Sequence, residues 1–266
     1  MSEHEQFNKV EPTPGERFSK FLKRKDVSST VAWAFFYTLV FVLVALYLYP
    51  RWMPKGLSNE MRSTTRLMVI FTIISAPVCG FVLSMATHAF LRRHKGDTPP
   101  ADGPGFSTNR LGVATFSVMA SILTLTAVIY GLVEMNTAAE ASVREAKDAM
   151  VVKVVGNQWV WTFEYPESMG GFKSEVLNLP LNKAVVFDIV SADVNHSFWP
   201  VQLGVKVDAN RLAHTTVTTK PIKLGEIDVK CAELCGLYHA YMETTGAVMT
   251  TDDFNKWVIT QGGHTA

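Results

Sequence analysis

Charged residues are scarce in this chain: Asp, Glu, Lys and Arg make up 18% of its 266 residues, against roughly 25% in soluble domains. The 25 basic and 24 acidic residues leave a net charge of only +1. This balance argues against nucleic acid as a partner, because phosphate binding needs a clustered basic face. Three cysteines are too few for a disulfide scaffold. The sequence also lacks a Gly-rich phosphate loop and a hydrolase nucleophile elbow.

Hydrophobic residues, by contrast, gather in three uncharged runs, residues 31–50, 67–91 and 111–133. Each run is long enough for a helix through the bilayer core, which takes about 20 residues. A buried helical hairpin in a large soluble protein is the alternative, but short loops rich in Lys and Arg separate the runs. We therefore expect a transmembrane region of three spans over residues 31–134.

Basic residues predict how these spans are oriented. The first 30 residues carry six Lys and Arg and the loop after the second run carries four, whereas the first loop carries four in all. Because Lys and Arg concentrate on the cytoplasmic side, residues 1–30 are expected to be a cytoplasmic tail. This tail is long and contains acidic residues, unlike a cleavable signal. We expect a multi-pass protein of a bacterial-type plasma membrane, with everything after residue 134 in the periplasm.

After the third run the residue pattern changes. Residues 135–149 are polar and rich in alanine, which predicts a helical or extended linker. Beyond it, short stretches such as Trp159–Tyr165 and Ala184–Val190 are rich in β-branched and aromatic residues and are separated by Gly, Pro and Asn. Such spacing predicts an all-β sandwich or barrel over residues 150–266.

Candidate metal ligands cluster late in the chain. Cys231, Cys235, His239 and Met242 lie in one short run, and His196 lies upstream. A disulfide between the two cysteines would suit an oxidising compartment, zinc would use Cys and His but seldom a thioether, and Met242 could simply be a core residue. Thiolate, imidazole and thioether together favour copper over these alternatives.

The same run resembles the dinuclear copper A site of cytochrome c oxidase subunit II. That pattern has a His in a D-V-x-H-S-[FW] strand end, followed by C-x-E-x-C-x-x-x-H-x-x-M. The sequence matches it at His196, Cys231, Glu233, Cys235, His239 and Met242. The resemblance implies a cupredoxin-like sandwich that belongs to the electron-accepting subunit of a haem-copper oxygen reductase.

The resemblance also implies a role for each matched residue. Cys231 and Cys235 would be thiolates that bridge two coppers, His196 and His239 would each bind one copper, and Met242 would be a weak axial ligand. In addition, Glu233 would offer its backbone carbonyl to copper and its carboxylate to a magnesium ion shared with the catalytic subunit.

Partners follow from the same resemblance. Trp159 would receive electrons from a periplasmic donor such as cytochrome c, and the electrons would pass to a haem-bearing catalytic subunit I. Other oxidase subunits and the lipid bilayer would be further partners. The domain from residue 140 onward carries more acidic than basic residues, which would suit a basic donor.

Two features depart from the family pattern. The chain has three predicted spans where the usual subunit has two, and Leu111-Gly112 stands where many members carry a Leu-Glu pair whose acid serves proton uptake.

Two alternatives to an oxidase subunit are a copper A subunit of a nitric oxide or nitrous oxide reductase and a membrane-anchored copper-binding or assembly module. Nitrous oxide reductase is disfavoured, because its propeller domain is missing from this sequence. A quinol oxidase subunit is also disfavoured, because such relatives have lost the copper ligands.

Overall fold

A computed structural model describes residues 25–91 and 110–265 of the chain. Most of the predicted cytoplasmic tail, residues 1–24, lies outside the described residues. The chain divides into two compact units, Met1–Trp52 with Leu67–Gly105, and Met53–Arg66 with Phe106–Ala266.

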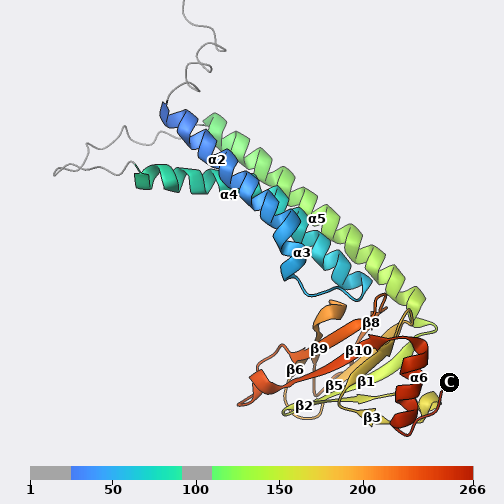
Figure 1. Ribbon diagram of the computed structural model, residues 1–266. Coiled ribbons are helices and arrows are strands. Elements are labelled where there is room, and N and C mark those ends of the chain that lie inside the picture. Colours follow the sequence, from blue (N-terminus) through green and yellow to red (C-terminus); the bar gives the residue numbers. More distant parts are fainter. Residues whose placement is uncertain (1–24, 92–109, 266) are drawn as a thin grey trace, which may run out of the picture. The chain divides into compact units, whose positions relative to one another are not determined.

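Long helices contain the three apolar runs (Figure 1). Helix α2 (Lys25–Leu43) continues through the π-helical segment η2 (Val44–Leu48) into α3 (Tyr49–Trp52), and it is followed by α4 (Asn59–Leu91) and α5 (Arg110–Ala146). In the described part of the chain, three helical stretches are long and apolar enough to cross a membrane: Val27–Trp52, Asn59–Leu91 and Phe116–Val133. The prediction of three apolar helices is confirmed, and helix α5 continues into most of the predicted linker.

A polar contact joins α2 to α4 within the first unit, and another lies within α4. The hydroxyl groups of Tyr37 and Thr87 are 2.8 Å apart and share a hydrogen bond. Ser84 of α4 is fully buried, and its hydroxyl donates to the carbonyl of Phe81 within the same helix. Because an unsatisfied polar group in hydrocarbon costs several kcal/mol, these bonds let polar side chains lie inside an apolar helix pair.

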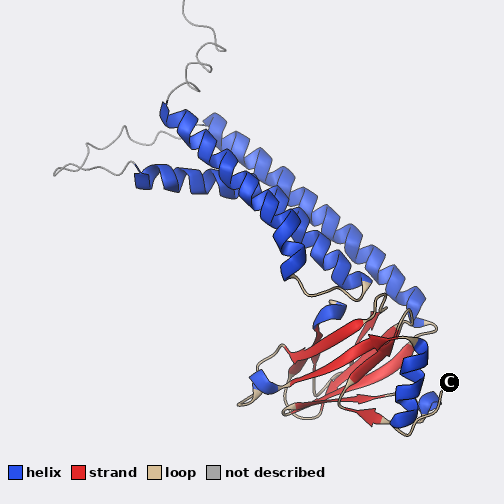
Figure 2. Cartoon of the chain, in the orientation of Figure 1, coloured by secondary structure: helices blue, strands red, loops and turns tan. Residues whose placement is uncertain are grey.

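The C-terminal part of the chain is a two-layer β-sandwich (Figure 2). The first sheet has the strand order β3-β2-β1-β5-β8, and the second has the order β4-β10-β9-β6-β7. The strands are β1 (Met150–Asn157), β2 (Val160–Glu164), β3 (Lys173–Ser174), β4 (Leu177–Pro180), β5 (Val185–Ser191), β6 (His196–Pro200), β7 (Val207–Ala209), β8 (Thr215–Thr219), β9 (Gly225–Cys231) and β10 (Glu243–Met249). The predicted all-β, cupredoxin-like fold is confirmed.

Short helices complete this sandwich. The 3-10 turns are η3 (Glu167–Met169), η4 (Val201–Leu203) and η5 (His239–Tyr241), and helix α6 (Thr251–Thr260) follows the last strand. The hydroxyl of Thr250 accepts a hydrogen bond from the backbone N–H of Asp253 and so caps α6.

Alternation of side chains explains why these segments form a sandwich. In β5 the residues are alternately buried and half-buried from Val185 to Ser191, which is the period of a strand with one face on a core. The largest fully buried side chains include Trp161, Phe163, Phe187 and Phe198. The rings of Phe163 and Phe187 lie edge-on to Phe198, so aromatic packing joins the two sheets.

The loop between the first two apolar helices is part of this sandwich. Leu57 is only 3% exposed and belongs to the core of the β-domain. Its backbone N–H donates to the carbonyl of Gln202 at 2.9 Å, and its own carbonyl accepts from the N–H of Ile222 at 2.7 Å. We call residues 53–61 the strap, because this segment is bonded to the sandwich on both sides.

Ser58 and Met61 extend the attachment of the strap. The buried hydroxyl of Ser58 donates to the carbonyl of Leu203 at 2.6 Å and accepts from the N–H of Met61 at 3.1 Å, which caps the first turn of α4. Gly204 has a φ of +67°, and a Cβ there would lie 2.5 Å from the backbone nitrogen of Met61. Only glycine therefore permits this close approach.

We predict that Leu57→Ala destabilises the β-domain by about 2–5 kcal/mol, because it leaves a cavity in the core. Denaturant unfolding of the full chain in detergent, followed by tryptophan fluorescence, would measure the loss. Leu212→Ala is the matched control, since Leu212 is 92% exposed. Equal stability of the two variants would contradict the role of the strap in the core.

Candidate metal centre

Two neighbouring strands bring the first two predicted ligands together. His196 begins β6 and Cys231 ends β9. The two strands are antiparallel, and Phe198 pairs with Cys231. Because the start of one antiparallel strand lies beside the end of its neighbour, His196 and Cys231 meet at the same end of the second sheet.

One loop supplies the remaining predicted ligands. It leaves β9 after Cys231, carries Cys235 and His239, and returns through Met242 to β10. The backbone N–H of Cys231 donates to the carbonyl of Met242 at 3.0 Å, which closes the loop at its base. Cys235 and Met242 are buried, so the loop folds its sulfur atoms inward.

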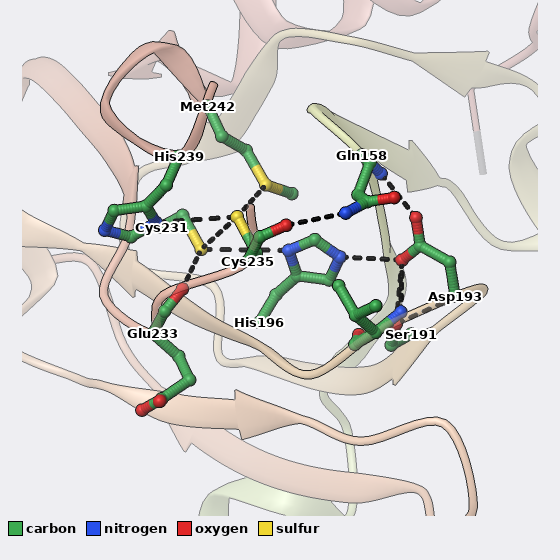
Figure 3. Close-up of polar contacts among 10 residues, drawn as sticks. Gln158, Ser191, Asp193, His196, Cys231, Glu233, Cys235, His239 and Met242 are labelled. Atoms are coloured by element: carbon green, nitrogen blue, oxygen red, sulfur yellow. Dashed lines mark hydrogen bonds and ion pairs between the residues drawn. The ribbon is translucent and has the colours of Figure 1, made fainter. Parts of the chain in front are cut away.

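The donor atoms converge on one small region (Figure 3). The Sγ atoms of Cys231 and Cys235 are 3.7 Å apart. The Nδ1 atom of His196 lies 3.8 Å from Cys231 Sγ, and the Nδ1 atom of His239 lies 3.4 Å from Cys235 Sγ. The Sδ atom of Met242 is 3.7 Å from Cys235 Sγ. Two thiols thus lie at the centre, with an imidazole on each side.

Glu233 contributes its backbone rather than its side chain. Its carbonyl oxygen is 3.2 Å from Cys231 Sγ, whereas its exposed carboxylate points away from the two sulfur atoms (Figure 3). The structure therefore brings all six residues of the predicted motif to one place. The backbone carbonyl of Glu233 faces the sulfur atoms, whereas its carboxylate does not.

Trp159 lies against the ligand loop. A Cβ on Gly236, the residue after Cys235, would be 3.4 Å from Cζ2 of the Trp159 ring. The Trp159 and Tyr238 rings are 4.7 Å apart, centroid to centroid, and meet edge to face. Trp161, in contrast, is buried in the core, where its ring meets that of His196 edge to face at 5.9 Å. Trp159 thus contacts non-ligand residues of the loop, whereas Trp161 contacts the predicted ligand His196 from the core.

The chemistry of these donors fits a soft metal. Both cysteines of the loop are free thiols, and the ligand atoms of His196, Cys231 and Cys235 lie within 4.8 Å of one another. Thiolates bind metals at about 2.3 Å, so one ion can contact both sulfur atoms at their observed separation. Thiolate, imidazole and thioether donors together are typical of copper sites.

Burial keeps the Cys235 thiol protonated until a metal binds. Burial and the neighbouring Cys231 thiol raise the pKa of Cys235 to about 12. Metal binding must therefore displace a proton from Cys235. A bound cation would compensate the negative charge of the Cys235 thiolate, which the apolar surroundings otherwise disfavour.

Asp193 orients one of the imidazole ligands, and sequence reasoning did not single it out. Its Oδ1 atom is 2.8 Å from Nε2 of His196, which leaves Nδ1 facing Cys231. Burial opposes ionisation of Asp193, but hydrogen bonds from His196 and from the N–H groups of Gln158 and Val194 hold its pKa below the ordinary value. Its place three residues before His196 in the D-V-x-H motif was the available signal.

Comparison with known proteins gives a match in the same part of the chain. A family model described as "Cytochrome C oxidase subunit II, periplasmic domain" matches residues 172–248. This segment includes His196 and the whole ligand loop. The chain belongs to the cytochrome c oxidase subunit II family. Trp159 lies outside the matched segment.

Curated relatives within the family cover part of the chain. Cytochrome c oxidase subunit 2 of Thermostichus vulcanus is 40% identical over 124 residues, which make up 47% of this chain and 37% of the relative. The subunit 2 of Bacillus subtilis is 35% identical over 143 residues, or 51% of this chain and 40% of the relative. The chain thus matches less than half the length of each of these relatives.

Among solved structures, the periplasmic domain of subunit II of cytochrome oxidase from Bradyrhizobium japonicum is similar. It is 29% identical, and the match covers 42% of this chain and 93% of that domain with a TM-score of 0.40.

We predict that Asp193→Ala lowers the metal affinity of this subunit II site roughly 10–100-fold, because the His196 ring loses its fixed orientation. Competition for copper against a chelator would measure the affinity of the purified chain. Asp188→Ala is the control, since Asp188 makes a similar 2.9 Å contact with the exposed His214 on the surface. Equal affinities in the two variants would contradict the assigned role.

Proposed function

We propose that this chain is the electron-accepting subunit of a cytochrome c oxidase. It takes single electrons from a periplasmic donor such as cytochrome c and passes them to haem in the catalytic subunit I, where oxygen is reduced. The observation that carries this proposal is the convergence of two thiols, two imidazoles and a thioether at one end of the sandwich.

The ligand residues have distinct tasks in this proposal. A bound copper pair would supply one-electron exchange. The thiolates of Cys231 and Cys235, the imidazoles of His196 and His239 and the thioether of Met242 would hold it. Because His196, Cys235 and Met242 are buried, their surroundings exclude water and hold the donors in place. Little rearrangement is then needed when the charge of the site changes.

Glu233 would serve two sites at once. Its carbonyl lies beside Cys231 and would complete the copper ligand set. Its exposed carboxylate faces away from the thiols (Figure 3), so it is free to bind a magnesium ion at the boundary with the catalytic subunit. Carboxylate oxygens are the ligands that magnesium prefers.

Trp159 would be the residue at which electrons enter. It is half-buried, and its ring contacts both Gly236 of the ligand loop and the more exposed Tyr238. An aromatic ring at this place connects the surface of the domain with the residue next to Cys235. This arrangement supports a direct path from a docked donor to the thiolates.

The domain organisation of the proposal follows the expected membrane topology. Residues 1–30 would be a cytoplasmic tail, spans near 31–50, 67–91 and 111–133 would cross the plasma membrane, and residues 135–149 would link them to the periplasmic domain 150–266. The three apolar helices support insertion into a lipid bilayer. Other oxidase subunits would surround these helices.

We predict that the full chain, purified from membranes and loaded with copper, binds a copper pair and turns purple with a mixed-valence EPR signal. Cys231→Ser should abolish the signal, because it removes one bridging thiolate. The copper-to-protein ratio, visible absorption and EPR would measure both results. A single copper, or colourless zinc binding, would refute the proposed centre.

The same purification separates the proposal from its alternatives. A subunit of an oxidase should copurify with haem and support oxygen uptake with reduced cytochrome c. Nitric oxide or nitrous oxide reduction without oxygen uptake would indicate one of the other reductases. Copper without haem or electron flux would indicate a copper-binding or assembly module.

We predict that Trp159→Phe slows reduction of the site by cytochrome c severalfold and leaves its EPR signal unchanged, because the smaller ring breaks contact with the loop. Stopped-flow mixing of reduced cytochrome c with the oxidised complex would measure the rate. Trp257→Phe is the control, since Trp257 packs against Tyr165 and Phe172 in another part of the domain. Equal rates for the two variants would sink the proposed role of Trp159.

A further inference from the structure

We propose that Gln158 is a positioning residue of the metal centre, which holds the backbone of Cys235 through its side-chain amide. This inference rests on the proposed function. Gln158 lies in the turn between β1 and β2 of the first sheet. Its Nε2 atom donates a hydrogen bond of 2.7 Å to the carbonyl of Cys235, on the loop that leaves the second sheet. The bond therefore joins the two sheets at the ligand loop (Figure 3).

The backbone of Gln158 reaches a second ligand. Its N–H donates to Oδ2 of Asp193 at 2.8 Å, and the other oxygen of Asp193 is 2.8 Å from Nε2 of His196. One residue thus contacts the backbone of a thiol ligand directly and an imidazole ligand through one carboxylate. Because these bonds lead to Cys235 and His196, a shift of Gln158 would move both the thiol of Cys235 and the imidazole of His196.

Gly236 makes the bond to Cys235 possible. Its φ is +119°, and a Cβ there would lie 2.9 Å from Nε2 of Gln158. A larger residue would therefore push the amide away from the carbonyl that it holds. The glycine after Cys235 gives the Gln158 side chain its access to the loop.

The ligand loop needs such an attachment because its tip packs against little. From Glu233 to Tyr238 every residue except Cys235 is exposed, and Leu234 and Leu237 are 78% and 81% exposed. Packing therefore holds the buried Cys235 side chain but does little to fix the exposed residues on either side of it. A hydrogen bond from outside the loop restricts the carbonyl, and with it the direction of the Cys235 side chain.

The position of Gln158 also joins the centre to Trp159. The two residues are adjacent in the chain, and both lie against Gly236. The bond to Cys235 consequently keeps the Trp159 ring at a constant distance from the ligand loop. Bonds of this kind, one step beyond the ligands, tune metal sites and typically contribute 10–100-fold to metal affinity.

Gln158→Met tests the proposal, because methionine is similar in length and uncharged but has no N–H donor. The full chain loaded with copper is compared with the natural sequence in the absence of any donor protein. We expect a changed hyperfine pattern in EPR, a shifted reduction potential and copper loss to a chelator roughly tenfold faster. Gln158→Ser removes the same donor and replaces the first variant if that variant does not accumulate.

Gln202→Met is the matched control. The Nε2 atom of Gln202 donates to Oδ2 of Asp228 at 2.6 Å, so this variant loses a similar bond in the same domain without touching the ligands. Its spectrum, potential and copper retention should equal those of the natural chain.

Each result has a separate meaning. Unchanged EPR, potential and copper loss in Gln158→Met would overturn the positioning role. Slower reduction by cytochrome c with an unaltered spectrum would also overturn it, since Gln158 would then act only in donor contact. Absence of the mixed-valence signal from the natural chain would instead refute the proposed function itself.

Discussion

The pairing of β6 with β9 is the constraint on which the proposed metal centre depends. These strands are antiparallel neighbours, with Phe198 opposite Cys231, so the start of β6 lies beside the end of β9. His196 and Cys231 are 35 positions apart in the chain, yet the register places their donor atoms 3.8 Å apart. A shift by one residue would turn His196 to the opposite face of the sheet. The aromatic packing of Phe198 on Phe163 and Phe187 holds this register.

Three further elements hold the residues around this pair: the loop after β9, Asp193 and Gln158. The loop after β9 carries the remaining ligands and is closed at its base by the bond from Cys231 to Met242. Asp193 fixes the ring of His196, and Gln158 contacts both Asp193 and the carbonyl of Cys235. Gln158 lies in the turn between β1 and β2 of the first sheet, and Asp193 lies in the connection from β5 of the first sheet to β6 of the second. The centre is therefore assembled between the sheets, and its geometry depends on their packing.

A different set of contacts attaches the loop between the first two apolar helices to the sandwich. The strap between the first two apolar helices places Leu57 in the core of the β-domain, and Ser58 caps α4 while bonding to Leu203. Residues that precede the sandwich by roughly a hundred positions thus complete its core. A fragment that begins after the third helix would lack Leu57, so experiments on the centre are best made with the full chain.

Local patterns were enough to predict much of this protein. Three uncharged runs indicated the long helices, short stretches rich in β-branched and aromatic residues indicated the sandwich, and the soft donors from Cys231 to Met242 indicated a candidate copper site, because each signal lies within a short stretch of sequence. Asp193 lies in the D-V-x-H motif, but no local pattern indicated which residues Leu57, Asp193 and Gln158 contact. Gln158 and Cys235 are 77 positions apart, and Ser58 and Leu203 are 145 apart. The sequence by itself determined which atoms are available to bind a metal, whereas the packing of two sheets and a strap decided what holds those atoms in place, since only folding brings such distant residues within hydrogen-bond reach.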